Sequence, residues 1–167
     1  MLDNDSRRIL AWRVHDFLDP GGSAALLVEA ARDLEGATPP MLLADAGVEN
    51  RNGDVDELVA AGRLRRVLAL TEVNFSNSII EAWWRTLKHQ WLFLHPLDSV
   101  ATVRRLVAFY VEEHNTRVPH AAFDGQTPDE VYFGTGEHVP VQLAAARVEA
   151  RRRRLELHRA ARCAVCV

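Results

Sequence analysis

The sequence has only two cysteines, a single lysine and no long hydrophobic run, and each scarcity excludes a class of protein. Cys163 and Cys166 form a lone pair at the carboxyl end, without the second pair of ligands that a structural zinc site needs. No stretch approaches the roughly 18 apolar residues of a membrane span, and no apolar segment of a signal peptide follows MLDNDSRR. We therefore expect free thiols and a cytoplasmic protein without a membrane segment.

The chain has little net charge, −3 over 167 residues, which argues against a protein that coats nucleic acid through bulk attraction. The distribution is uneven, however. Residues 1–73 hold 8 basic and 13 acidic side chains, whereas residues 74–167 hold 12 and 10, and seven of those twelve are arginines between Arg147 and Arg162. A phosphate-binding surface is therefore expected in the second half. The lone lysine, Lys88, we attribute to codon usage rather than to mechanism.

An apolar content of 48% is enough to fill one core, and the first half alternates strand-like and helix-like patterns. Turn residues, caps and changes of apolar period predict, in order, a strand over 8–14, a helix over 23–34, a strand over 41–44, a helix over 55–61 capped by Asp54 and Gly62, and a strand over 64–70. This order favours an α/β layer fold with a parallel, buried component.

The second half is predicted to be mostly helical. From Asn77 onward, apolar residues recur at helical spacing and define one face, comprising Ile80, Trp83, Trp84, Leu87 and Trp91. A second helix should run from a cap at Asp98 to about residue 114, with Val100, Val103, Val107, Tyr110 and Val111 inward. A loop over 117–126, a short helix starting at T-P-D-E (127–130) and a final Ala/Arg helix after Pro140 follow, and no domain boundary is evident before about residue 135.

Two carboxylates stand out by position. Asp45 ends an apolar strand, so its side chain should project from the carboxyl edge of the sheet, where ligand sites of open α/β folds collect. Glu81 heads a polar stripe on the helix face opposite the tryptophans, with Asn77, Arg85 and Lys88 at helical spacing. Each also has a purely structural interpretation: Asp45 as a turn-forming acid before Gly47, and Glu81 as a solvated helix charge.

Four ordered blocks resemble the DDE-type insertion-sequence transposases and retroviral-type integrases. The most specific is N-S-I-I-E-A-W-W-R-T-L-K-H at 77–89, which is similar to that family's glutamate helix, N-x-x-x-E-x-x-(W/F)-R-T-L-K. The others are L-D-N-D-S-R-R-I-L-A-W at 2–12, D-A-G-V-E-N at 45–50 and H-N-T-R-V-P-H-A-A-F-D-G-Q-T-P-D-E-V-Y at 114–132. Independent motifs in the family's order make coincidence improbable.

The resemblance implies an RNase H-like fold and a metal-binding triad of two aspartates and one glutamate, in which Asp45 and Glu81 take the second and third places. Two Mg²⁺ or Mn²⁺ ions would serve DNA strand cleavage and transfer. The same resemblance assigns DNA contacts to the polar residues of the glutamate helix and of the 114–132 block, namely Asn77, Arg85, Lys88, Arg117 and His120. A bacterial insertion sequence is the implied source, DNA is the implied partner, and the oligomeric state, including a homo-oligomer, stays open.

The family's first catalytic aspartate belongs to a block resembling W-x-x-D-x-T that precedes the match at Leu2, so the sequence does not contain it. We therefore expect a three-layer fold lacking its opening strand, with residues 1–135 as a partial catalytic core and 136–167 as a basic helical tail. An inactive, truncated transposase is the expected function. One alternative is a non-enzymatic DNA-binding or assembly module that uses the arginine-rich helix. That helix can also be interpreted as a solvated helix whose charge is balanced by Glu149 and Glu156. A further alternative is an RNase H-type nuclease, which the 114–132 block does not support.

Overall fold

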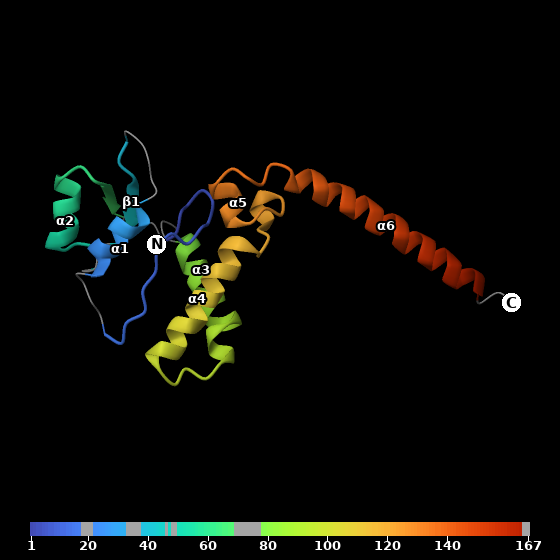
Figure 1. Cartoon of the computed structure of the whole chain (residues 1–167), viewed down its shortest axis with the longest axis horizontal. Helices are drawn as coiled ribbons and strands as arrows, with labels where there is room; N and C mark the ends of the chain where they lie inside the picture. The colour runs from blue at the N-terminus through green and yellow to red at the C-terminus, as the bar shows by residue number, and fades with distance from the viewer. Residues whose placement is uncertain (18–21, 33–37, 46, 48–49, 69–77, 165–167) are drawn as a thin grey trace. The chain divides into compact units, whose positions relative to one another are not determined.

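In the computed structural model of the chain, residues 1–17, 22–32, 38–45, 47, 50–68 and 78–164 are described (Figure 1). These residues form two compact units, 1–113 and 114–167. The sequence predicts the end of the core-like part near residue 135, and that boundary stays a prediction. No helix in the described ranges combines the length and the apolar character needed to cross a membrane.

A two-stranded parallel sheet with two helices opens the first unit. Strands β1 (Met41–Ala44) and β2 (Arg65–Leu68) pair in register, Met41 opposite Arg65 and Ala44 opposite Leu68. Helices α1 (Gly22–Ala30) and α2 (Gly53–Ala60) precede and separate them in the chain, and Leu27, Val55 and Leu64 form a small shared core. The predicted order of helix, strand, helix and strand after residue 22 and the parallel pairing are thus confirmed for the described residues; positions 33–34 and 69–70 of the predicted elements lie outside them.

Two details of this layer differ from the predictions, and one agrees. Strand β1 is not buried, because Met41 is 64% and Leu43 37% exposed. The cap of α2 is Asn52 rather than Asp54: Asn52 has the extended backbone of an N-cap, and its side chain accepts a hydrogen bond from the Val55 amide at 3.1 Å. Gly62 does occupy the positive-φ position after α2, at φ +67°.

The predicted strand over 8–14 is wrong. The segment makes one antiparallel bridge, between Leu2 and Ile9, and the Leu10 amide donates to the Met1 carbonyl at 3.0 Å. A strand requires a ladder of backbone hydrogen bonds to a neighbour, whereas this segment bonds to residues 1–3 through a single bridge and a few flanking hydrogen bonds. Its apolar side chains still pack inward, since Ile9 and Ala11 are buried.

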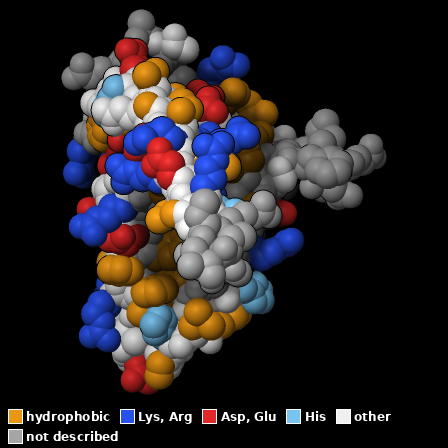
Figure 2. All heavy atoms as spheres, turned by 90° about the vertical axis from the view of Figure 1, so that its right-hand side faces the viewer, with side chains coloured by type: hydrophobic (Ala, Val, Ile, Leu, Met, Phe, Trp, Pro, Cys, Tyr) orange, Lys and Arg blue, Asp and Glu red, His pale blue; other side chains and the backbone are white. Residues whose placement is uncertain are grey.

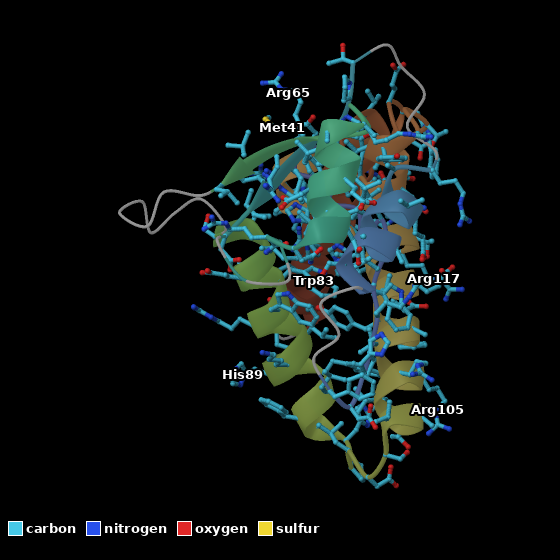
Figure 3. All side chains as sticks on the ribbon, turned by 90° about the vertical axis from the view of Figure 1, so that its left-hand side faces the viewer. Met41, Arg65, Trp83, His89, Arg105 and Arg117 are labelled. Atoms are coloured by element: carbon cyan, nitrogen blue, oxygen red, sulfur yellow. The ribbon has the colours of Figure 1, made fainter. Side chains whose placement is uncertain are left out.

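The main core of the first unit lies between two helices. Helix α3 (Ser78–Gln90), the 3-10 turn η1 (Leu92–Leu94) and α4 (Val100–Thr116) follow one another, and α3 and α4 lie side by side (Figures 1 and 3). Their buried contacts, together with Ile9, comprise Trp83, Leu87, Leu92, Val107 and Val111. The Trp91 indole donates to the Leu106 carbonyl at 3.0 Å and ties the turn to α4. Figure 3 shows Trp83 pointing between the two helices.

The amino end of α4 is capped one residue later than predicted. The Ser99 hydroxyl, not Asp98, accepts a hydrogen bond from the Thr102 amide at 3.1 Å. Asp98 contributes from the preceding position, where hydrogen bonding to the Thr102 side chain lowers the pKa of its carboxyl. Both side chains therefore satisfy groups of the first turn, as the first amides of a helix require.

The second unit contains a closely hydrogen-bonded turn region and one long helix. Its elements are η2 (Ala121–Phe123), α5 (Pro128–Tyr132) and α6 (Val139–Ala164). Thr127 caps α5 in a capping box: its hydroxyl accepts from the Glu130 amide at 3.2 Å, and the Glu130 carboxylate accepts from the Thr127 amide at 2.8 Å. The predicted helix start at T-P-D-E and the final helix are both confirmed, the latter beginning one residue before Pro140.

Replacing Leu87 tests whether the α3–α4 contact carries the stability of the first unit. Leu87 is fully buried, so Leu87→Ala should lower the free energy of unfolding by about 2–5 kcal/mol through lost burial and a residual cavity. Leu94→Ala in the same unit removes the same atoms from a side chain that is 70% exposed and should cost less than about 0.5 kcal/mol. Urea titrations followed by tryptophan fluorescence measure both, and equal losses would contradict this packing.

A candidate nucleic-acid and metal-binding surface

The exposed face of α3 carries a shallow, open groove. Five side chains line it, namely Glu81, Trp84, Arg85, Lys88 and His89. Trp84 and Arg85 follow Glu81 by three and four residues, and Lys88 and His89 follow Arg85 by three and four, which is the spacing of one helix face. Trp83 and Leu87 lie on the buried side. The polar stripe predicted from Glu81, Arg85 and Lys88 is therefore present and accessible. Asn77, its expected first member, lies outside the described residues.

Trp84 is the feature of this groove that the sequence did not predict. Its place in the apolar pattern assigned it to the core, but the ring is 42% exposed. The Trp84 ring meets the buried ring of Trp83 edge-on, with centroids 5.2 Å apart. The Lys88 ammonium lies 5.8 Å from the centroid of the Trp84 ring. An indole held by one neighbour and faced by a cation is a fixed, amphipathic surface.

His89 is the second residue that sequence reasoning passed over, because its spacing from other histidines gave no metal-ligand pattern. It points outward from α3 (Figure 3) and meets Phe93 edge-on at a centroid distance of 5.2 Å. Its position eight residues after Glu81 places it on the same face of the helix. This spacing of eight residues from Glu81 was the sequence signal that could have found His89. It indicates a residue of the groove rather than a metal ligand.

Asp45 directly follows β1, where the sequence predicted it, and its carboxylate is exposed. One oxygen, Oδ1, accepts hydrogen bonds from the Gly47 amide at 3.0 Å and from the Asn50 side-chain amide at 2.9 Å. The structural role considered for this residue, a turn-forming acid before Gly47, is therefore real. This role uses only one of the two carboxylate oxygens, because among the described residues Oδ2 accepts no hydrogen bond.

Glu81 lies in the first turn of α3 and is also exposed. No hydrogen bond joins it to Asp45, and within the described ranges no three histidine, cysteine, aspartate or glutamate side chains gather closely enough to hold a metal ion. By chemistry the two carboxylates fit Mg²⁺ or Mn²⁺, since hard cations prefer such oxygens. Their convergence on one ion stays a prediction.

The remaining predicted DNA contacts belong to the second unit. Arg117 is exposed directly after α4, and His120 is half-buried. The His120 ring is committed locally: its Nδ1 accepts from the Ala122 amide at 3.3 Å as the cap of η2, and the ring lies 4.9 Å from Phe123. The 114–132 block thus folds onto itself, and its accessible cation is Arg117 rather than His120.

Comparison with known families identifies the class of this surface. A model of the integrase core domain family matches residues 74–128, about a third of the chain, which spans α3, η1, α4 and η2. No curated protein matches the sequence. The matched region includes Glu81, Arg85 and Lys88. Residues 74–128 therefore match an integrase core domain, and this match supports the resemblance to a DDE integrase/transposase catalytic core that the sequence blocks predicted.

Quenching by iodide tests the position of Trp84. Because Trp84 is 42% exposed beside Lys88 and Trp83 is only 8% exposed, Trp84→Phe should remove most of the tryptophan emission that iodide quenches. The matched variant Trp83→Phe should remove emission that iodide does not reach. Stern–Volmer plots for the two variants provide the comparison, and an equal loss of quenching in both would show that Trp84 is not the accessible ring.

Proposed function

We propose that the chain serves DNA transposition or integration, with Asp45 and Glu81 as carboxylates of a divalent-metal site and the α3 groove as the adjoining DNA contact. The observation that supports this most is the integrase core match over α3, in which Glu81 begins a face that continues with Arg85 and Lys88. An RNase H-like arrangement in three layers belongs to the same proposal. The parallel pairing of β1 and β2 agrees with it.

The proposed metal ligands would come from two different elements. Asp45 would use Oδ2, because Oδ1 is already held by Gly47 and Asn50, and these two bonds fix the orientation of the carboxylate. Glu81 would reach outward from the first turn of α3. The chemistry that bound Mg²⁺ supplies in such sites is activation of a water or a 3′-hydroxyl and stabilisation of the leaving oxygen at phosphorus.

The basic residues of the groove would hold the DNA backbone. Lys88 acts as a point charge toward phosphate, whereas Arg85 offers a planar fork of donors for two oxygens. Both lie one to two turns from Glu81 on the exposed face of α3. Trp84, whose ring lies beside the Lys88 ammonium, adds an apolar surface on which a sugar or a base can rest. The residues of the groove therefore position phosphate near Glu81 without bulk positive charge.

A non-enzymatic DNA-binding or assembly module is the second candidate. The observation that favours it is the basic surface of α6, which is independent of the carboxylates. Figure 2 shows that Lys and Arg side chains on one face of the molecule are interspersed with acidic and hydrophobic ones, so binding would depend on local groups rather than overall charge. The two candidates differ in whether Asp45 and Glu81 matter.

A metal-binding measurement distinguishes the two candidate functions directly. Asp45→Asn and Glu81→Gln should each weaken Mn²⁺ binding by about tenfold or more, because each removes one of two anionic ligands. The matched controls are the exposed acids of α2, Asp54→Asn and Glu57→Gln, which should leave binding unchanged. Electron paramagnetic resonance of free Mn²⁺ measures all four variants. If the controls weaken binding as much as the site variants, the proposed site is wrong.

Strand transfer by the isolated chain is expected to be absent. The described residues bring no third carboxylate to Asp45 and Glu81, and two ligands hold a second ion poorly. An assay with labelled oligonucleotide duplexes and Mg²⁺ or Mn²⁺ tests this, and turnover that Glu81→Gln abolishes would contradict it. Salt-dependent DNA binding that Asp45→Asn leaves intact, without metal binding, would instead support the non-enzymatic module.

A further inference from the structure

The two sides of α6 differ in how their arginines are engaged. On one side, Arg152 forms ion pairs with Glu149 and Glu156, both at 2.8 Å, and Arg153 pairs with Glu149 at 2.8 Å. These hydrogen bonds from Arg152 and Arg153 lower the pKa of Glu149, which favours its ionised form. The positive charges on this side of the helix are largely compensated by acids one turn away.

The other side of α6 carries basic residues that have no acidic neighbour. These residues are Arg147, Arg151, Arg154 and His158, which follow one another at intervals of four, three and four residues. At roughly 100° per residue, the four positions fall within an arc of about 60° around the helix axis. All four are exposed, and in the described part of the chain none of them forms an ion pair. We call these four residues the basic stripe.

The basic stripe has the dimensions of a contact with a nucleic-acid backbone. Eleven residues separate Arg147 from His158, so the stripe is about 16 Å long at 1.5 Å per residue. Duplex DNA advances about 3.4 Å per base pair, and the stripe therefore matches roughly five base pairs of phosphates. Its guanidinium groups suit phosphate oxygens, which they bind as planar forks.

A helical partner fits α6 less well. The exposed apolar residues Val141, Val148 and Leu155 recur at every seventh position, but a coiled-coil seam needs a second apolar residue in each repeat. In the last two repeats the positions three and four residues further on are occupied by Arg151 and Arg152, and by His158 and Arg159. A second copy of the same helix would also bring like charges together.

We propose that the basic stripe of α6 is a duplex-DNA contact that binds phosphates on one helix face, while the ion-paired face turns away from the DNA. The choice of DNA as the polyanion rests on the proposed function. The geometry of the stripe is independent of the proposed function, because all four residues belong to the second unit. The contact is separate from the α3 groove and adds binding without a role in the chemistry.

Two double variants with identical composition test the stripe. Arg151→Gln with Arg154→Gln removes two cations from the stripe, and Arg152→Gln with Arg153→Gln removes two from the opposite face, so the change in net charge is the same. Fluorescence anisotropy of a labelled duplex at several salt concentrations gives the slope of log K against log salt. The stripe variant should lose about 1.8 from this slope, 0.9 per phosphate contact, and the control variant close to none.

The outcomes separate the stripe from bulk charge and from other polyanions. Equal slope changes in the two variants, or no change in either, would overturn the stripe, with circular dichroism of both verifying that α6 remains helical. Binding of phosphatidylserine vesicles that depends on the stripe, without duplex binding, would overturn DNA as the ligand. Mn²⁺ binding by both double variants should equal that of the unsubstituted chain, because neither pair of arginines belongs to the proposed metal site, so loss of the metal site and loss of the stripe contact are distinguishable.

Discussion

The packing of α3 against α4 is the contact on which the rest of the structure depends. Leu87 is fully buried there, Trp83 meets Tyr110 at a centroid distance of 5.9 Å, and the Trp91 indole is tied to the α4 backbone. Because one face of α3 is committed to this contact, the opposite face must lie in solvent. The outward direction of Glu81, Arg85 and Lys88 is therefore a consequence of where the apolar side chains go.

Asp45 has a structural role in the turn after β1, and the proposed metal site would give the same side chain a chemical role. Asp45 closes a turn after β1 through a single carboxylate oxygen, and this bonding orients the group rather than consuming it. Preorganised ligands of this kind hold cations better than freely rotating ones. The integrase core match extends over α3 and α4 but not over β1, so the proposed role of Asp45 depends more heavily on the D-A-G-V-E-N block than that of Glu81 does.

Charge in this protein acts through local arrangement. The chain is slightly acidic overall, yet α3 and α6 each present cations along one face. On α6 the acids stand on the ion-paired face, so basic residues that look alike in the sequence are divided into compensated and uncompensated groups. Such exposed ion pairs contribute little to stability individually. Their larger effect is to leave the uncompensated arginines together on the other side.

Sequence alone determined the order of helix and strand after residue 22, the parallel direction of β1 and β2 and the capped start of α5, because local period and turn chemistry decide these. It also determined the resemblance of the glutamate helix to an integrase core, because the motif is specific. Only the tertiary structure decided that Arg8–Val14 is not a strand, that Trp84 faces solvent and that Asn52 rather than Asp54 caps α2. A strand needs a partner, and an apolar residue at the edge of a helix face needs a neighbour to cover it. Local pattern fixes neither the partner nor the cover, because both depend on which other segments come to lie beside the residue. The Asn52 cap is a local bond to Val55, and the extended backbone at Asn52 decides it.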